Sequence, residues 1–192
     1  MSVEGLLFTG GASRRLGVAK ATLRRDGERL VDRGARVLQE VCTSVLEVGP
    51  GYGTLPSILE DPPGQGPLAA LAAGADALAA TDARGPVLAL AVDLPFVDVP
   101  LLSWLAEHPS DRTVVPVVGG IRQTLCARYA PDATVKAAEL VVAGERSLRS
   151  LLAAVPVEEV GEDEWGAVTD ARSFTDVDSA DDAARAGLEP PG

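Results

Sequence analysis

Residues 6–20 read Leu-Leu-Phe-Thr-Gly-Gly-Ala-Ser-Arg-Arg-Leu-Gly-Val-Ala-Lys. The apolar start is typical of a buried strand, which then breaks into a glycine-rich loop. Gly10 and Gly11 let backbone N–H groups approach an anion closely. Residues 14–25 hold five basic side chains and no acidic one, although the chain has a formal net charge of −11. The stretch therefore predicts a site for a small polyanion, most simply a nucleoside triphosphate. The alternative, a plain strand-to-helix turn, needs neither the second glycine nor the cations.

The bulk composition is that of an ordinary globular protein. With 192 residues, 46% hydrophobic and 23% charged, the chain fits one domain over residues 1–192. Its acidic balance argues against nucleic acid as a partner, because phosphate backbones demand a net positive face. Neither a signal peptide nor a transmembrane run is evident, so we expect a cytoplasmic protein without membrane contact. Cys42 and Cys126 stand in apolar surroundings and are expected to be buried thiols.

Apolar runs and helical stripes alternate along the chain, which predicts a three-layer α/β/α, Rossmann-like fold. Its sheet is expected to be mostly parallel, with one late antiparallel hairpin turning at Gly119-Gly120 and pairing 113–118 with 123–129. The lone His108 is expected at a helix end. The predicted strands are 3–8, 44–48, 55–59, 86–92, 113–118, 123–129 and the edge strand 157–160. The predicted helices are 30–41, 67–80, 99–107, 131–143, 148–154 and 181–186.

Asp93 follows six apolar residues, in Ala-Val-Asp-Leu-Pro, and is expected at the carboxyl end of a buried strand. Ligands of open α/β sheets bind at that edge. An unpaired carboxylate there is costly, and a nucleotide-borne Mg²⁺ would satisfy it. The alternative is a turn or helix-capping aspartate before Pro95.

Two further acidic segments have a similar ambiguity. Asp61, in Glu-Asp-Pro-Pro-Gly, is a candidate contact for a base or ribose, but Asp-Pro and Pro-Gly also form surface turns unaided. In residues 174–182, Asp178 or Ser179 is expected to cap the last helix. A second metal contact from Asp176 or Asp178 is the sharper hypothesis for the same segment.

Taken together, four segments resemble the molybdenum cofactor guanylyltransferase (MobA-like) family of nucleotidyltransferases. Residues 9–20 are similar to the family's Ala-Gly-Gly-x-Ser-x-Arg-Met-Gly-x-Asp-Lys, and residues 66–71 to its Gly-Pro-Leu-Ala-Gly-Leu. Ala-Val-Asp-Leu-Pro-Phe-Val, at 91–97, resembles Cys-Asp-x-Pro-Phe. Residues 174–182 resemble Phe-x-Asn-Val-Asn-Thr-Pro-Glu-Asp. The resemblance covers nearly the whole chain and implies a fold of the nucleotide-diphospho-sugar transferase type.

The resemblance also implies a reaction, in which GMP passes from GTP to the phosphate of molybdopterin and pyrophosphate is released with Mg²⁺ as cofactor. GTP and molybdopterin or the molybdenum cofactor are then the small partners, and molybdoenzyme apoproteins or chaperones are implied as protein partners. The alternatives are a molybdopterin cytidylyltransferase, a phospholactate guanylyltransferase or another small-phosphate nucleotidyltransferase. A non-catalytic nucleotide-binding relative is the alternative from another class, since one fold hosts many functions.

The family's functional residues can be carried over onto the matching positions. Arg15, Lys20 and Asp93 are the implied catalytic residues: the two cations stabilise phosphate charge, and Asp93 holds the metal. Asp61 is implied to contact the guanosine. The implied nucleotide-contacting positions are Phe8, Thr9, Gly10, Gly11, Lys20, Asp61 and Asp93.

The chain also departs from the family pattern. Thr9, Ala19 and Ala70 replace the family's Ala, Asp and Gly, while Asp176 and Asp178 stand where Asn is common.

Overall fold

The structure is a computed structural model that describes residues 2–10, 16–81 and 83–191. The strands are β1 (Glu4–Phe8), β2 (Arg24–Arg25), β3 (Glu28–Arg29), β4 (Val45–Val48), β5 (Ser57–Ile58), β6 (Val87–Ala91), β7 (Thr113–Val118), β8 (Ile121–Arg122), β9 (Cys126–Tyr129) and β10 (Val157–Val160). The α-helices are α1 (Leu30–Gln39), α2 (Pro67–Ala79), α3 (Val99–Glu107), α4 (Pro131–Val142), α5 (Leu148–Ala154), α6 (Glu162–Trp165) and α7 (Ala180–Arg185). Two 3₁₀ helices, η1 (Lys20–Thr22) and η2 (Ala171–Phe174), complete the set. Except for 123–129, every predicted element is found within two residues of its expected bounds.

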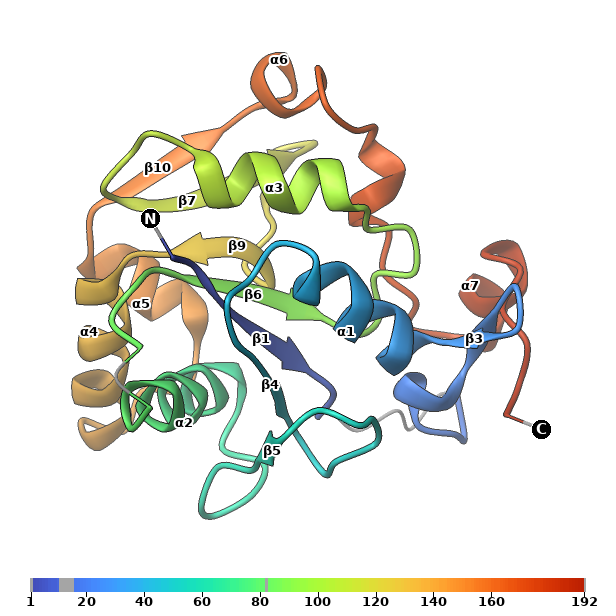
Figure 1. Cartoon of the computed structure of the whole chain (residues 1–192), viewed down its shortest axis with the longest axis horizontal. Helices are drawn as coiled ribbons and strands as arrows, with labels where there is room; N and C mark the ends of the chain where they lie inside the picture. The colour runs from blue at the N-terminus through green and yellow to red at the C-terminus, as the bar shows by residue number, and fades with distance from the viewer. Residues whose placement is uncertain (1, 11–15, 82, 192) are drawn as a thin grey trace.

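The main sheet has the strand order β10-β7-β9-β6-β1-β4-β5, with β8 paired to β7 (Figure 1). The strands β6, β1, β4 and β5 run parallel to one another, as β10 does to β7. Only β8 and β9 run antiparallel to their neighbours within this sheet. The predicted three-layer, mostly parallel fold is therefore confirmed.

Burial on both faces explains why β6 lies near the middle of the sheet. Its sequence Val-Leu-Ala-Leu-Ala is apolar at every position, which suits a strand covered by helices on either side. Leu88 and Leu90 pack into the core beneath α1 and α3, whereas Val87 and Ala89 pack into the core beneath α2, α4 and α5. Helix α2 approaches the sheet closely because Gly74 lies where a Cβ would meet Leu6 at 2.8 Å.

The prediction for residues 123–129 needs a correction. The Gly119-Gly120 turn does join two antiparallel strands, but the hairpin partner of β7 is the two-residue strand β8. Only residues 126–129 of the predicted strand are extended, as β9, and they lie between β7 and β6. All four of these residues are buried, which favours the interior position over the edge.

Several smaller expectations are confirmed. Cys42 and Cys126 are free and buried. His108 caps the end of α3, and Ser179, rather than Asp178, caps α7 by accepting a hydrogen bond from the Asp182 N–H. Among the helices that the structure describes, none is long and apolar enough to cross a membrane.

Candidate active site

A lysine held by two carboxylates forms the centre of the site. The Lys20 Nζ donates to Asp93 Oδ2 at 2.7 Å and to Asp178 Oδ1 at 2.6 Å. Lys20 begins η1, Asp93 comes just after β6, and Asp178 lies in the segment before α7. The three side chains are 18%, 24% and 58% exposed, so a ligand can reach them. The structure thus brings together Lys20 and Asp93, two of the three expected catalytic residues.

The charge state of this cluster follows from its contacts. Burial acts to lower the pKa of Lys20, but the hydrogen bonds and charges of Asp178 and Asp93 outweigh it, so the pKa is raised above its ordinary value. For the neighbouring Asp176, burial raises the pKa, and so do the nearby charges of Asp178 and Asp93. Lys20 therefore stays a cation at neutral pH, beside three neighbouring aspartates.

The C-terminal segment is fastened to the site by its backbone. The Val177 N–H donates to the Asp93 carbonyl at 3.1 Å, and this bond sets Asp178 beside Lys20. Further on, Arg24 and Glu189 exchange two backbone hydrogen bonds of 2.9 and 2.8 Å, which dock the chain's last described residues on the β2–β3 hairpin. Residues 176–189 therefore act as a strap that carries one of the two carboxylates.

Glu47 is a buried residue beside the candidate site that the sequence did not single out. Its side chain is fully buried, and its Oε1 accepts from the Thr9 hydroxyl at 2.7 Å. The same oxygen accepts the N–H groups of Gly51 and Tyr52 at 3.1 and 2.7 Å, while Oε2 accepts that of Gly53 at 2.9 Å. The carboxylate therefore joins the start of the glycine-rich loop to the loop after β4. Its signal in the sequence is a lone acid inside the apolar run Val-Leu-Glu-Val.

The approach of these two loops leaves no room for a side chain at Gly49. A Cβ there would lie 2.1 Å from Thr9 Oγ1. Thr9 stands at a position where the family commonly has alanine. Its hydroxyl occupies the space beside Gly49 and donates a hydrogen bond to Glu47 Oε1.

Two backbone polar groups at the end of β1 already form hydrogen bonds with neighbouring strand ends. The Phe8 carbonyl accepts from Val92 N–H, and the Thr9 N–H donates to the Val48 carbonyl, each at 3.0 Å. Gly10 is the first exposed residue after the strand. Of the predicted loop residues, Gly11 and Arg15 lie outside the described ranges.

Asp61 is exposed, between β5 and α2. Across residues 2–10, 16–81 and 83–191, no hydrogen bond or ion pair connects its side chain with Lys20, Asp93 or Asp178. The structure therefore does not join it to the lysine cluster.

A second feature that the sequence did not reveal is an aromatic ring between two guanidinium groups. The Phe96 ring, three residues after Asp93, has the Arg25 Cζ at 4.4 Å from its centroid and the Arg172 Cζ at 3.9 Å. Such cation–π contacts hold both arginines beside the turn that carries Asp93. Arg172 lies more than 70 residues away along the chain, so no local pattern indicates the pairing.

The donor set also allows a test for a metal. Among the described residues, no group of three or more His, Cys, Asp or Glu side chains could hold an ion by itself. Magnesium, however, commonly uses only one or two carboxylates together with substrate phosphates. Asp93 and Asp178 already converge on one cation, the Lys20 ammonium. They therefore fit a divalent ion that arrives with a nucleotide.

Comparison with known proteins gives a consistent result. A crystal structure of molybdopterin-guanine dinucleotide biosynthesis protein A from Archaeoglobus fulgidus superposes with a TM-score of 0.77 at 21% identity, covering 95% of this chain and 96% of that one. The chain is 31% identical over 196 residues to a probable molybdenum cofactor guanylyltransferase of Chloroflexus aggregans, covering 95% of this chain and 92% of the relative. A probable molybdenum cofactor guanylyltransferase of Mycobacterium tuberculosis H37Rv is 34% identical over 198 residues, covering 98% of this chain and 92% of the relative.

The fold and the relatives place the protein in the nucleotidyltransferase class. The family description that matches is the MobA-like NTP transferase domain, over residues 5–160. The chain belongs to this family, as its four motifs predicted.

Proposed function

We propose that the protein transfers GMP from GTP to the phosphate of molybdopterin and releases pyrophosphate. The observation that carries the proposal is the Lys20 ammonium held by Asp93 and Asp178 at the carboxyl edge of the sheet, in a chain whose near-full-length relatives are named as molybdenum cofactor guanylyltransferases. Ligands of open α/β sheets bind at this edge. We further propose that residues 1–192 act as one catalytic unit.

The chemistry needs positioning and charge stabilisation more than covalent help. An oxygen of the acceptor phosphate attacks the α-phosphorus of GTP, the bond from that phosphorus to the bridging oxygen breaks, and pyrophosphate leaves with the electron pair. A phosphate monoester is largely dianionic at pH 7, because its second pKa is about 6, so the nucleophile needs no general base. Lys20 stays protonated, since its pKa is raised, and it donates to the phosphate oxygens on which charge builds up.

A divalent cation, magnesium in our proposal, is the implied cofactor. Asp93 and Asp178 would hold it, and when bound it supplies neutralisation of the triphosphate charge. Arg15 is proposed to add a second cation at the phosphates. The Gly10–Gly11 backbone is proposed to contact the triphosphate, and Asp61 the guanosine.

Pyrophosphate release, measured with molybdopterin and each nucleoside triphosphate in turn, tests the substrates. We expect turnover with GTP and Mg²⁺ and little with CTP, ATP or UTP. Equal turnover on CTP would exclude guanine specificity and favour a cytidylyltransferase. Nucleotide binding without turnover on any acceptor would indicate a non-catalytic relative.

Lys20→Ala and Asp93→Ala test the site itself. Loss of one such electrostatic contact typically costs about two to three orders of magnitude in rate. The matched control is Lys136→Ala, since Lys136 lies on the outer face of α4 and forms a surface ion pair with Glu139. Near-normal activity of either site variant, with the control also normal, would refute the assignment.

A further inference from the structure

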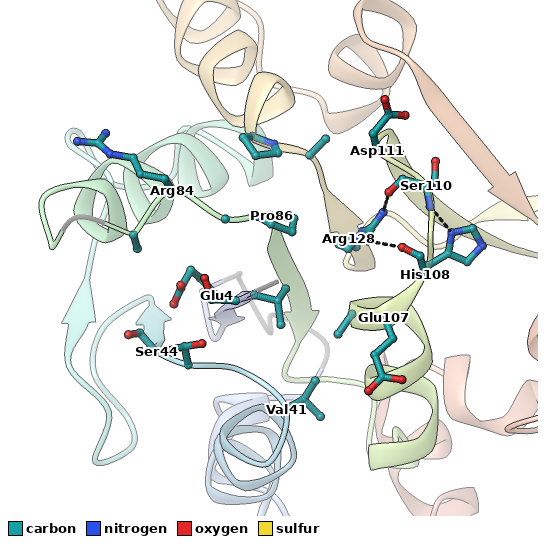
Figure 2. Close-up of a pocket in the computed structure, with 18 of the residues that line it drawn as sticks. Glu4, Val41, Ser44, Arg84, Pro86, Glu107, His108, Ser110, Asp111 and Arg128 are labelled. Atoms are coloured by element: carbon teal, nitrogen blue, oxygen red, sulfur yellow. Dashed lines mark hydrogen bonds between the residues drawn. The ribbon is translucent and has the colours of Figure 1, made fainter.

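A hollow lies at the opposite edge of the sheet from Lys20. Its volume is about 1110 Å³, and it opens where β1, β4 and β6 begin (Figure 2). It is lined there by Glu4, Ser44 and Pro86, and on the far side by the end of α3 and by Arg128 of β9. No residue of the proposed reaction lines it.

Two buried charged side chains in this hollow each leave a polar atom without a partner. Glu4 is 4% exposed and Arg128 is 5% exposed. Within the part of the chain that the structure describes, neither Glu4 Oε2 nor Arg128 Nε has a hydrogen-bond partner. The remaining nitrogens of Arg128 are engaged, because they donate to the carbonyls of His108, Ser110 and Arg112. A buried unpaired acceptor and a buried unpaired donor are costly, so a complementary occupant would be stabilised here.

The surrounding charge favours a cationic occupant. Four carboxylates line the hollow against three arginines, and of the four only Glu40 has an ion pair among the described residues, with Arg36. Helices α1, α2 and α3 all end at this edge and present partial negative charge, whereas α4 alone begins there. The lining carboxylates are Glu4, Glu40, Glu107 and Asp111.

The strand register indicates how large the occupant must be. Glu4 is aligned with Val87 and Tyr129, whereas Arg128 is aligned with Leu88, so Glu4 and Arg128 leave the sheet on opposite faces. They belong to β1 and β9, which are separated by β6 and hence by about 10 Å. An occupant that reaches both must cross the sheet edge at Pro86, which lies between them in Figure 2. A single small amine is too short for this, but a few extended peptide residues are long enough.

We infer that this hollow is a docking site for a basic segment of a partner protein. An arginine or lysine of the segment pairs with the Glu4 carboxylate, and a backbone carbonyl of the segment accepts from Arg128 Nε. One class of occupant thus satisfies both unpaired atoms and suits the charge and the width of the hollow.

The test uses backbone amide NMR shifts of the ¹⁵N-labelled full chain. The probe is the blocked pentapeptide Ala-Ala-Arg-Ala-Ala, and its citrulline counterpart is the neutral control. We expect the arginine peptide to shift the amides of Glu4, Ser44, residues 107, 108 and 110–112, and Arg128, and to leave those of Lys20 and Asp93 unchanged. The citrulline peptide should bind at least tenfold more weakly. Absence of shifts at millimolar peptide, or shifts spread over the whole surface, would overturn the inference.

Variants assign the binding to the hollow. Glu4→Gln should weaken the arginine peptide at least tenfold, whereas Glu139→Gln on the outer face of α4 should not. If Glu4→Gln does not fold, exposed Ser44 offers a second route: Ser44→Arg places a guanidinium in the hollow and should block binding, but Ser44→Ala should not. The proposal is contradicted if Glu4→Gln or Ser44→Arg binds the arginine peptide as tightly as the parent does. It is also contradicted if free agmatine binds the parent as tightly as the peptide does.

Discussion

Replacing Glu47 by glutamine tests how strongly the two loops of the site are tied together. The carboxylate accepts four hydrogen bonds in a fully buried position. A glutamine oxygen at Oε1 keeps three of them, but its NH₂ group then faces the Gly53 N–H, so that two donors meet. Losing a hydrogen bond to a charged group costs about 1.5–3 kcal/mol, and leaving the part-buried Gly53 N–H without an acceptor adds at most about 1–3 kcal/mol more.

The expected net loss is therefore about 3 kcal/mol, since a neutral side chain recovers part of the cost through its easier desolvation. Urea unfolding followed by circular dichroism measures this loss as a lower midpoint at an unchanged slope. In a chain of this size it corresponds to a fall in Tm of about 6–12 °C. A Glu47→Gln protein within about 0.5 kcal/mol of the parent would refute the reasoning, because that is the effect of an ordinary surface change.

Thr9→Val is the companion variant, because it removes only the hydroxyl donor to Glu47 Oε1. It should cost about 1 kcal/mol. In the double variant, the two losses should not add, since the residues are in direct contact. Strict additivity would show that the 2.7 Å hydrogen bond between them contributes nothing to stability.

Three further results are expected. Asp178→Asn should lower the pKa of Lys20, which NMR titration of its side chain can follow. In the parent, the contribution of this cluster to folding stability is fully present below pH 10.5, the ordinary pKa of lysine, and is lost as the pH rises through the raised pKa of Lys20 in the folded protein. A Lys20 titration that is the same in parent and variant would exclude the contact. Burial raises the pKa of Cys42 and Cys126 to about 12, so thiol reagents at pH 8 should label both only after unfolding; rapid labelling of native protein would contradict their burial. Ser179→Ala should lower the unfolding free energy by about 1 kcal/mol through loss of the α7 cap, and an unchanged urea midpoint would show that this cap is dispensable.

The fold was predictable where a local pattern has one physical solution. The short apolar run of β6 is typical of a strand covered on both faces, and Asp93 follows it at the carboxyl end of that strand. Ser147 caps α5, because a serine before an apolar stripe satisfies an otherwise unpaired helix N–H. The closeness of Lys20 and Asp93 came from the family resemblance, since nothing local joins residues 73 positions apart.

Other elements were missed for identifiable reasons. The β2–β3 hairpin has two-residue strands with charged side chains, so it lacks an apolar alternation. Its signal was the Asp26-Gly27 dipeptide, in which both residues have positive φ. The insertion of β9 between β7 and β6 depends on pairing over long sequence distances, which no window of the sequence shows. The buried hydrogen bonds of Glu47 were not predicted, because a lone acid in a strand is ordinarily interpreted as a surface position.

The strap that carries Asp178 sets the order in which the site is assembled during protein synthesis. A ribosome makes the chain from its N-terminus, and Lys20 and Asp178 are 158 residues apart. The strands β1, β4 and β6 can pair long before Asp178 has been made, whereas the lysine cluster cannot close. A nascent chain can therefore pair these central strands first, but it can close the lysine cluster only after synthesis has passed the strap.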